Sequence, residues 1–92
     1  MELKHDSNWI YVTDDDNNII AEVTFPNVKE GVVNMNHTFV DNSLRGQGVA
    51  GKLVEAAYDS IKEQGKKVVP SCPYAVKWFE EHPEKNDIVE EE

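Results

Sequence analysis

The chain has 92 residues, a mass of 10.5 kDa and a formal net charge of −9, from 18 acidic against 9 basic residues. A chain of this length holds one hydrophobic core, because such cores usually need roughly 50–200 residues, so a two-domain enzyme is excluded. The negative charge opposes a nucleic-acid backbone or an anionic membrane surface, and we expect neither as a partner.

The cysteine content and the first residues of the sequence indicate a reducing, cytoplasmic compartment. The single cysteine, Cys72, cannot form an internal disulfide, and the opening MELKHDSNWI lacks the apolar stretch of a signal peptide. His5 and His82 have no second histidine or cysteine at ligand spacing, so we expect no metal site.

The first forty residues predict three antiparallel strands. Residues 9–13 and 19–25 are rich in β-branched and aromatic side chains, and the turn-forming run DDDNN separates them as in a hairpin. Pro26, Asn27 and Gly31 break the second run, and the third strand is predicted over residues 32–40.

The next segment changes its apolar spacing to three and four residues, which predicts an amphipathic helix. Its apolar face consists of Ala50, Leu53, Val54, Ala57, Tyr58 and Ile61. Gly65 is typical of a helix C-cap, and Val68–Val69 predicts a short buried strand that completes a right-handed strand–helix–strand crossover.

The last part of the chain predicts a second helix and then an acidic tail. Pro73 favours the first turn of this helix, Val76, Trp78 and Phe79 would form its apolar face, and Pro83 would end it. The predicted fold class is therefore α+β, with one domain over residues 1–83 and a tail over residues 84–92.

The densest motif is RGQGVAGK at residues 45–52, between the third strand and the first helix. Glycines that lead into a helix let backbone N–H groups approach an anion closely, and the helix dipole favours phosphate. Arg45 is the only arginine in the chain, and its planar fork suits phosphate. We therefore predict a phosphate-binding loop; the alternative is a tight turn in which the glycines only supply positive φ.

Two nucleotide-binding motifs match this loop only in part. The glycine spacing G-x-G-x-x-G suits a dinucleotide, but Ser71 and Cys72 stand about 20 positions on, where an acidic residue is needed. The loop also matches a P-loop, except that Leu53 replaces the hydroxyl residue that binds magnesium. A dehydrogenase, kinase or ATPase is therefore disfavoured.

A third match extends beyond the loop. The run RGQGVA at residues 45–50 has the form R/Q-x-x-G-x-G/A and resembles the acetyl-CoA pyrophosphate loop of the Gcn5-related N-acetyltransferases. The spacing of Cys72, Ala75 and Phe79 is similar to the N-x-x-A-x-x-x-Y pattern at the start of that superfamily's cofactor-packing helix. The short length, the H-T-x-V strand and the S-C-P-Y turn resemble its minimal single-domain family.

The resemblance implies a small Gcn5-like fold with acetyl-CoA as co-substrate. Strands 32–40 and 67–71 would splay apart and leave a slot for the acetyl thioester, with backbone groups of Thr38–Val40 on the pantetheine arm. N–H groups across Gln47–Gly51 would hold the pyrophosphate, with Arg45 alongside. The cofactor-binding residues implied in this way are Thr38, Phe39, Val40, Arg45, Gly46, Gln47, Gly48, Val49, Ala50, Gly51 and Lys52.

The chain departs from the family pattern at the reacting end. It lacks the N-terminal helices that usually form the acceptor pocket, Cys72 replaces the usual Asn, and Phe79 lacks the Tyr hydroxyl that often protonates the leaving thiolate. A helix start at Cys72 would stabilise a thiolate, so this residue could accept the acetyl group, donate a proton to the leaving sulfur, or only pack. We favour the donor or positioning role because the net charge opposes a thiolate. His37 is the candidate general base, with a structural hydrogen bond as its alternative.

The predicted function is an acetyl-CoA-dependent N-acyltransferase with a cationic amine as acceptor, because the negative charge of the chain favours such a substrate. Two alternatives belong to other classes. One is a CoA-binding module without transfer activity, and the other is an acidic protein-interaction domain in which the glycine loop is only a turn.

Overall fold

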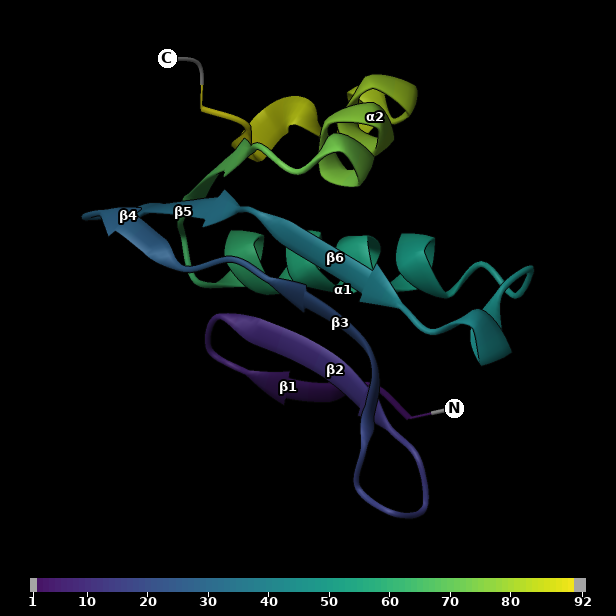
Figure 1. Cartoon of the computed structure of the whole chain (residues 1–92). Helices are drawn as coiled ribbons and strands as arrows, with labels where there is room; N and C mark the ends of the chain where they lie inside the picture. Colours follow the sequence, from purple (N-terminus) through teal and green to yellow (C-terminus); the bar gives the residue numbers. More distant parts are fainter. Residues whose placement is uncertain (1, 91–92) are drawn as a thin grey trace.

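The computed structural model describes residues 2–90 and contains seven strands, two α-helices and two short 3-10 helices (Figure 1). The strands are β1 (Lys4–Asp6), β2 (Trp9–Thr13), β3 (Ile19–Thr24), β4 (Asn27–Lys29), β5 (Val32–Met35), β6 (His37–Val40) and β7 (Lys67–Pro70). The helices are α1 (Val49–Glu63) and α2 (Pro73–Glu81), and the 3-10 helices span Asn42–Leu44 and Pro83–Ile88. The predicted α+β class is confirmed.

The strands form two sheets, and residues 32–40 contribute β5 to one sheet and β6 to the other. The four-stranded sheet is antiparallel and has the order β1-β2-β3-β6, while the three-stranded sheet has the order β4-β5-β7 with β5 and β7 parallel. Figure 1 shows α1 behind the four-stranded sheet, whose front is covered by no helix of residues 2–90, and α2 beyond β7.

The predicted third strand is divided between the two sheets at Asn36. The carbonyl oxygen of Met35, at the end of β5, accepts the N–H groups of Ser71 and Cys72 at 3.0 and 3.2 Å. The next N–H group, that of Asn36, instead donates to Thr24 O at 3.3 Å, in the neighbouring sheet. The chain therefore leaves β7 at this point and pairs with β3, so that β6 and β7 splay apart as the resemblance implied.

Two short strands were not predicted. The edge strand β1 has the sequence KHD, and β4, with the sequence NVK, is exposed along its whole length. Neither strand has the apolar alternation by which a half-buried strand is found in a sequence. The stretch around Asn27 is therefore half of a hairpin with β5 and not only a break, and Gly31 at φ 75° makes its turn.

The helices bury nearly the faces that their spacing predicts. In α1 the buried residues are Val49, Leu53, Val54, Ala57, Tyr58 and Ile61, so Val49 takes the place expected for Ala50. In α2 they are Ala75, Trp78 and Phe79. The prediction that Val76 lies on the buried face is wrong, because its side chain is 37% exposed. It comes directly after the buried Ala75, and successive residues of a helix point in different directions. No helix within residues 2–90 is long and apolar enough to cross a membrane.

The segment predicted as an acidic tail from Glu84 packs against β7 in its described part. Ile88 is only 5% exposed and belongs to the hydrophobic core. Val89 forms a parallel bridge with Val68, and the N–H group of Glu90 donates to Val68 O at 2.9 Å. The apolar pair at 88–89 therefore fixes residues 84–90 to the domain, while residues 91 and 92 of the predicted tail lie outside the described residues.

Candidate functional site

The first turn of α1 has the backbone geometry of an anion site. Gly46 and Gly48 have φ values of 81° and 69°, in the left-handed region that favours glycine. Gly48 is the N-cap of α1, and no side chain caps this helix start. The N–H groups of the first turn therefore remain available to an anion, with the positive end of the helix dipole behind them.

A hollow of about 250 Å³ lies at this helix start. It is lined by Val40, Leu44, Arg45, Gly46, Gly48, Val49, Ala50, Gly51 and Tyr74. A Cβ atom added at Gly46 or Gly48 would meet no protein atom within 4 Å, so the space beside these glycines is open. The structure therefore brings most of the predicted loop residues, with Arg45, to one concave surface.

Two predicted loop residues lie away from this hollow. Gln47 is exposed and does not line it. Lys52 lines a different hollow, which it shares with Glu55 and Asp59. The sequence could not separate these residues from their neighbours, because a loop that enters a helix sends successive side chains in different directions.

The unpaired edge of β6 faces the gap between the two sheets. β6 pairs only with β3 among the described strands, and the N–H group of Asp41 donates to Ile20 O at 2.8 Å. In an antiparallel ladder hydrogen-bonded pairs alternate, so Thr38 and Val40 turn their backbone N–H and C=O groups to the free edge. This edge can pair with the amides of an extended ligand.

Cys72 lies on the other side of the gap, at the start of α2. It is the N-cap residue that the sequence predicts, and its Sγ atom accepts the N–H group of Ala75 at 3.3 Å. The same Sγ atom lies 3.4 Å from Thr38 Oγ1. The thiol is 8% exposed, so it is nearly buried at the point where β6 and α2 meet.

The other predicted catalytic residue, His37, points to the opposite face of the sheet. Its Nε2 atom lies 3.3 Å from Glu22 Oε2, and its side chain is 52% exposed. Successive residues of a strand face opposite sides, and the neighbouring residue Thr38 is the one that contacts Cys72. The structure therefore does not bring the side chains of His37 and Cys72 together.

Tyr74 is a site residue that the sequence analysis missed. It lies in the first turn of α2, is 41% exposed, and its hydroxyl would be 3.5 Å from a Cβ atom at Gly51. Partial burial, and then the charge of Glu81, raise the pKa of Tyr74, so its hydroxyl keeps its proton and can donate a hydrogen bond. The sequence signal that could have found Tyr74 is its place directly after Cys72-Pro73. Phe79, which stands where the family pattern has a Tyr, is buried in the core.

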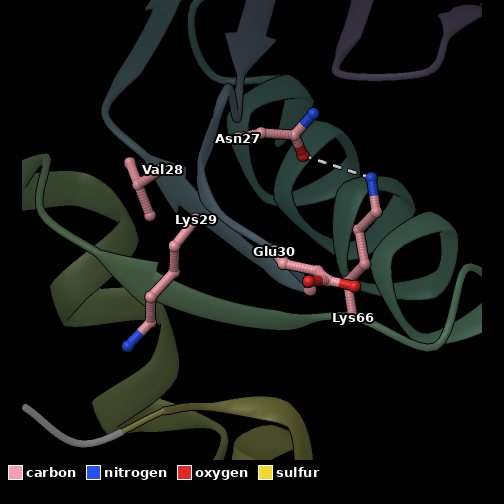
Figure 2. Close-up of a pocket in the computed structure, with 6 residues that line it drawn as sticks. Asn27, Val28, Lys29, Glu30 and Lys66 are labelled. Atoms are coloured by element: carbon pink, nitrogen blue, oxygen red, sulfur yellow. Dashed lines mark hydrogen bonds between the residues drawn. The ribbon is translucent and has the colours of Figure 1, made fainter.

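A third hollow lies at the far end of the sheets from the glycine loop, beside the β4–β5 hairpin (Figure 2). Its lysines are already engaged, since Lys66 Nζ donates to Asn27 Oδ1 at 3.1 Å and Lys29 Nζ lies 3.0 Å from Glu90 Oε2. Within residues 2–90 no group of three His, Cys, Asp or Glu residues could hold a metal ion.

The fold is that of the N-acetyltransferase-like proteins. A GCN5-like protein from Staphylococcus aureus, solved by NMR, has a TM-score of 0.79 and 35% identity, over 97% of this chain and 87% of that chain. The GNAT family N-acetyltransferase YhbS from Escherichia coli, solved in complex with CoA, has a TM-score of 0.59 and 34% identity, over 67% of this chain and 38% of that chain.

The chain belongs to the GCN5-related N-acetyl-transferase family, whose model matches residues 9–88. Protein NATD1 from Homo sapiens is 33% identical over 63 residues, which is 68% of this chain and 56% of NATD1. The chain therefore matches only about half the length of this curated relative. The predicted resemblance to the Gcn5-related N-acetyltransferases is therefore confirmed at the level of the family.

Proposed function

We propose that this protein binds acetyl-CoA in the gap between β6 and α2 and transfers the acetyl group to an amine. The observation that carries the proposal is that three features meet along β6, because Val40 lines the hollow at the start of α1 and Thr38 contacts Cys72. The three features are the uncapped start of α1, the free edge of β6 and the thiol of Cys72. The CoA bound to the E. coli relative supports the choice of ligand.

The residues of the gap fit the parts of this ligand in order. N–H groups from Gly48 to Gly51, with Arg45 beside them, suit a pyrophosphate because a helix start attracts anions. The backbone groups of Thr38 and Val40 suit the amides of a pantetheine arm. The arm would then lead from the hollow at Tyr74 toward Cys72.

When bound, acetyl-CoA supplies a thioester carbonyl to a neutral amine, so that a C–N bond forms and the C–S bond breaks. We assign to Cys72 the proton that the departing sulfur needs. Its Sγ atom accepts the N–H group of Ala75, and when Thr38 Oγ1 also donates to this Sγ atom, the thiol hydrogen is available to the departing sulfur. The thiolate that remains is held by this N–H group and by Thr38 Oγ1, until it takes up the proton lost by the amine.

A covalent route through Cys72 is the alternative for the same residue. On this route the Cys72 sulfur, as a thiolate, attacks the thioester carbonyl, so that an S–acetyl bond forms while the bond to the CoA sulfur breaks and the CoA thiolate leaves. The acetyl group would then pass from the Cys72 sulfur to the amine. The two routes differ in whether the protein gains an acetyl group before any acceptor is added.

A CoA-binding module without transfer activity is the second candidate function. The separation of His37 from Cys72 favours it, as does the buried Phe79 ring, which has no hydroxyl to offer. An acceptor screen that measures free CoA thiol separates the two functions. Transfer predicts thiol release that depends on both the amine and the protein, while the module predicts binding of acetyl-CoA with no release.

The test of Cys72 combines thiol release with intact mass. We expect Cys72→Ala to lower the rate of amine-dependent thiol release by about 10²–10⁴-fold, the usual contribution of a positioned acid or base. We also expect no stable mass gain in the wild-type protein with acetyl-CoA alone. An acetyl adduct that is lost in Cys72→Ser would establish the covalent route, and full activity of Cys72→Ala would remove this residue from the chemistry.

A further inference from the structure

The face of the four-stranded sheet that points away from α1 carries a group of aromatic side chains. Ile10 and Val23 are fully buried on the α1 side, so the alternating residues Trp9, Tyr11 and Phe39 point to the other side of the sheet. No helix of residues 2–90 covers this side (Figure 1). The Trp9 and Tyr11 rings are stacked, with centroids 3.9 Å apart, and Phe39 is 39% exposed.

Glu22 lies at the centre of this aromatic face. Its direct cross-strand partners are Tyr11 on one side and Phe39 on the other. The indole N–H group of Trp9 donates to Glu22 Oε1 at 2.9 Å, and His37 Nε2 lies 3.3 Å from Oε2. The carboxylate side chain is only 23% exposed, so it is fixed in place and partly withdrawn from water.

A carboxylate held between aromatic rings attracts an alkylammonium group in two ways. The charge acts directly, and the faces of aromatic rings add a cation–π attraction. The lysine on this face does not fill the position, because Lys4 Nζ donates to Thr13 Oγ1 at 2.8 Å. Within residues 2–90, no lysine or arginine forms an ion pair with Glu22.

We propose that this surface, which we call the Glu22 face (Trp9, Tyr11, Glu22, His37 and Phe39), docks a basic polypeptide through a lysine side chain. The lysine ammonium would lie over Glu22, between the rings of Tyr11 and Phe39. Three neighbouring strands present these residues on an open sheet, which suits a polypeptide better than a small amine, because small molecules bind in concave pockets. A second copy is disfavoured, since it would bring another net charge of −9.

The Glu22 face and the proposed reaction site share strand β6 and use its two opposite sides. On β6, His37 and Phe39 face the docked polypeptide, while Thr38 between them contacts Cys72 on the other side. A docked polypeptide could therefore present a neighbouring amine at the edge of the gap. Only this role as acceptor rests on the proposed acetyl transfer, and docking can be measured without acetyl-CoA.

The test is an NMR titration of ¹⁵N-labelled protein with a lysine-rich peptide in the absence of acetyl-CoA. We expect the indole N–H signal of Trp9 to move while that of the buried Trp78 does not. Glu22→Gln should weaken binding at least tenfold. Glu55→Gln removes the same charge from an exposed position on α1, is the matched control, and should bind as the wild type does.

Several outcomes would overturn the proposal. They are an unmoved Trp9 signal, equal weakening by Glu55→Gln, or equal binding of a peptide whose lysines are acetylated. Binding of butylamine as tight as that of the peptide would indicate a small-amine site instead, and signal changes on dilution alone would indicate self-association. Phe39→Ala supplies a second variant, and undiminished binding by both it and Glu22→Gln would contradict docking at this face. A failure of acetyl-CoA binding would leave these results unchanged, so the two proposals fail separately.

Discussion

Among the single residues of the site, Tyr74 is the one whose role is easiest to isolate. Its hydroxyl lies at the hollow beside Gly51, and its pKa is raised, by burial first and by Glu81 second. We expect Tyr74→Phe to weaken acetyl-CoA binding by about 3–10-fold, which corresponds to one lost hydrogen bond of roughly 0.5–1.5 kcal/mol. Calorimetric titration of both proteins measures this ratio.

The pH dependence of the same ratio gives an internal control. An ordinary tyrosine loses its proton near pH 10, whereas the raised pKa of Tyr74 keeps the donor in place to higher pH. The advantage of the wild type over Tyr74→Phe should therefore persist at pH 10. An advantage that disappears between pH 8 and pH 9 would contradict the role of this hydroxyl as a donor.

The sequence predicted where a residue stands in a helix or strand better than it predicted where its side chain points. The N-cap role of Cys72 follows from Pro73 and from the helix period, because both are local signals. The pairing of His37 with Cys72 could not be judged in the same way. Which face a strand residue takes depends on the partner strand, and the break at Asn36 sets that register.

At the scale of elements, a polar clamp joins α1 to the last 3-10 helix. Tyr58 Oη donates to Asp87 Oδ1 at 2.8 Å, and Lys62 Nζ donates to Asp87 Oδ2 at 2.9 Å. The Lys85 ammonium lies over the Tyr58 ring, 4.7 Å from its centroid. Together with the buried Ile88, this clamp holds in place the segment that the sequence predicts as an acidic tail from Glu84.

The clamp predicts a pH-dependent contribution to stability. Hydrogen bonds from Lys62 first, and then from Tyr58, lower the pKa of Asp87. A carboxyl whose pKa is lower in the folded state stabilises the fold above its unfolded pKa of about 3.9, and this contribution is lost as the pH falls through the folded value. Asp87→Asn should therefore lower the melting temperature at pH 7, and its deficit should shrink below about pH 4.

Thermal unfolding of Asp87→Asn, Lys62→Gln and the double variant tests the clamp. Both single variants remove the same ion pair, so the double variant should lose less than the sum of the two single losses. Additive losses, or a deficit of Asp87→Asn that stays constant down to pH 2, would show that the pair does not act as a clamp.

The elements were predictable where an apolar period was present. The spacing within residues 50–61 reflects burial on one face, and the β-branched and aromatic content of 9–13 and 19–25 is typical of strands; the structure has α1, β2 and β3 there. The strands β1 and β4 lie at sheet edges and bury little, so nothing in their composition marks them. The division of residues 32–40 between two sheets needs the hydrogen bonds of Met35 and Asn36, which are long-range contacts.

At the scale of the whole molecule, the two sides of the four-stranded sheet have different parts in the account. The α1 side contains the core and continues to the glycine loop. The backbone N–H groups clustered at this loop can attract an anion although the chain carries a net charge of −9. The other side presents the Glu22 face without a covering helix of residues 2–90 (Figure 1). Strand β6 contributes to both sides, because Thr38 contacts Cys72 while Phe39 belongs to the Glu22 face.

The most direct test of acetyl-CoA binding in the gap between β6 and α2 is a calorimetric titration of Gly48→Val beside Gly31→Val. Both glycines have positive φ, at 69° and 75°, and neither has an atom within 4 Å of an added Cβ, so the two variants carry similar backbone strain. Gly48 starts α1, whereas Gly31 lies in the β4–β5 turn at the far end. The account predicts acetyl-CoA affinity at least tenfold weaker in Gly48→Val and unchanged in Gly31→Val. Equal affinity of folded Gly48→Val and wild type would contradict it.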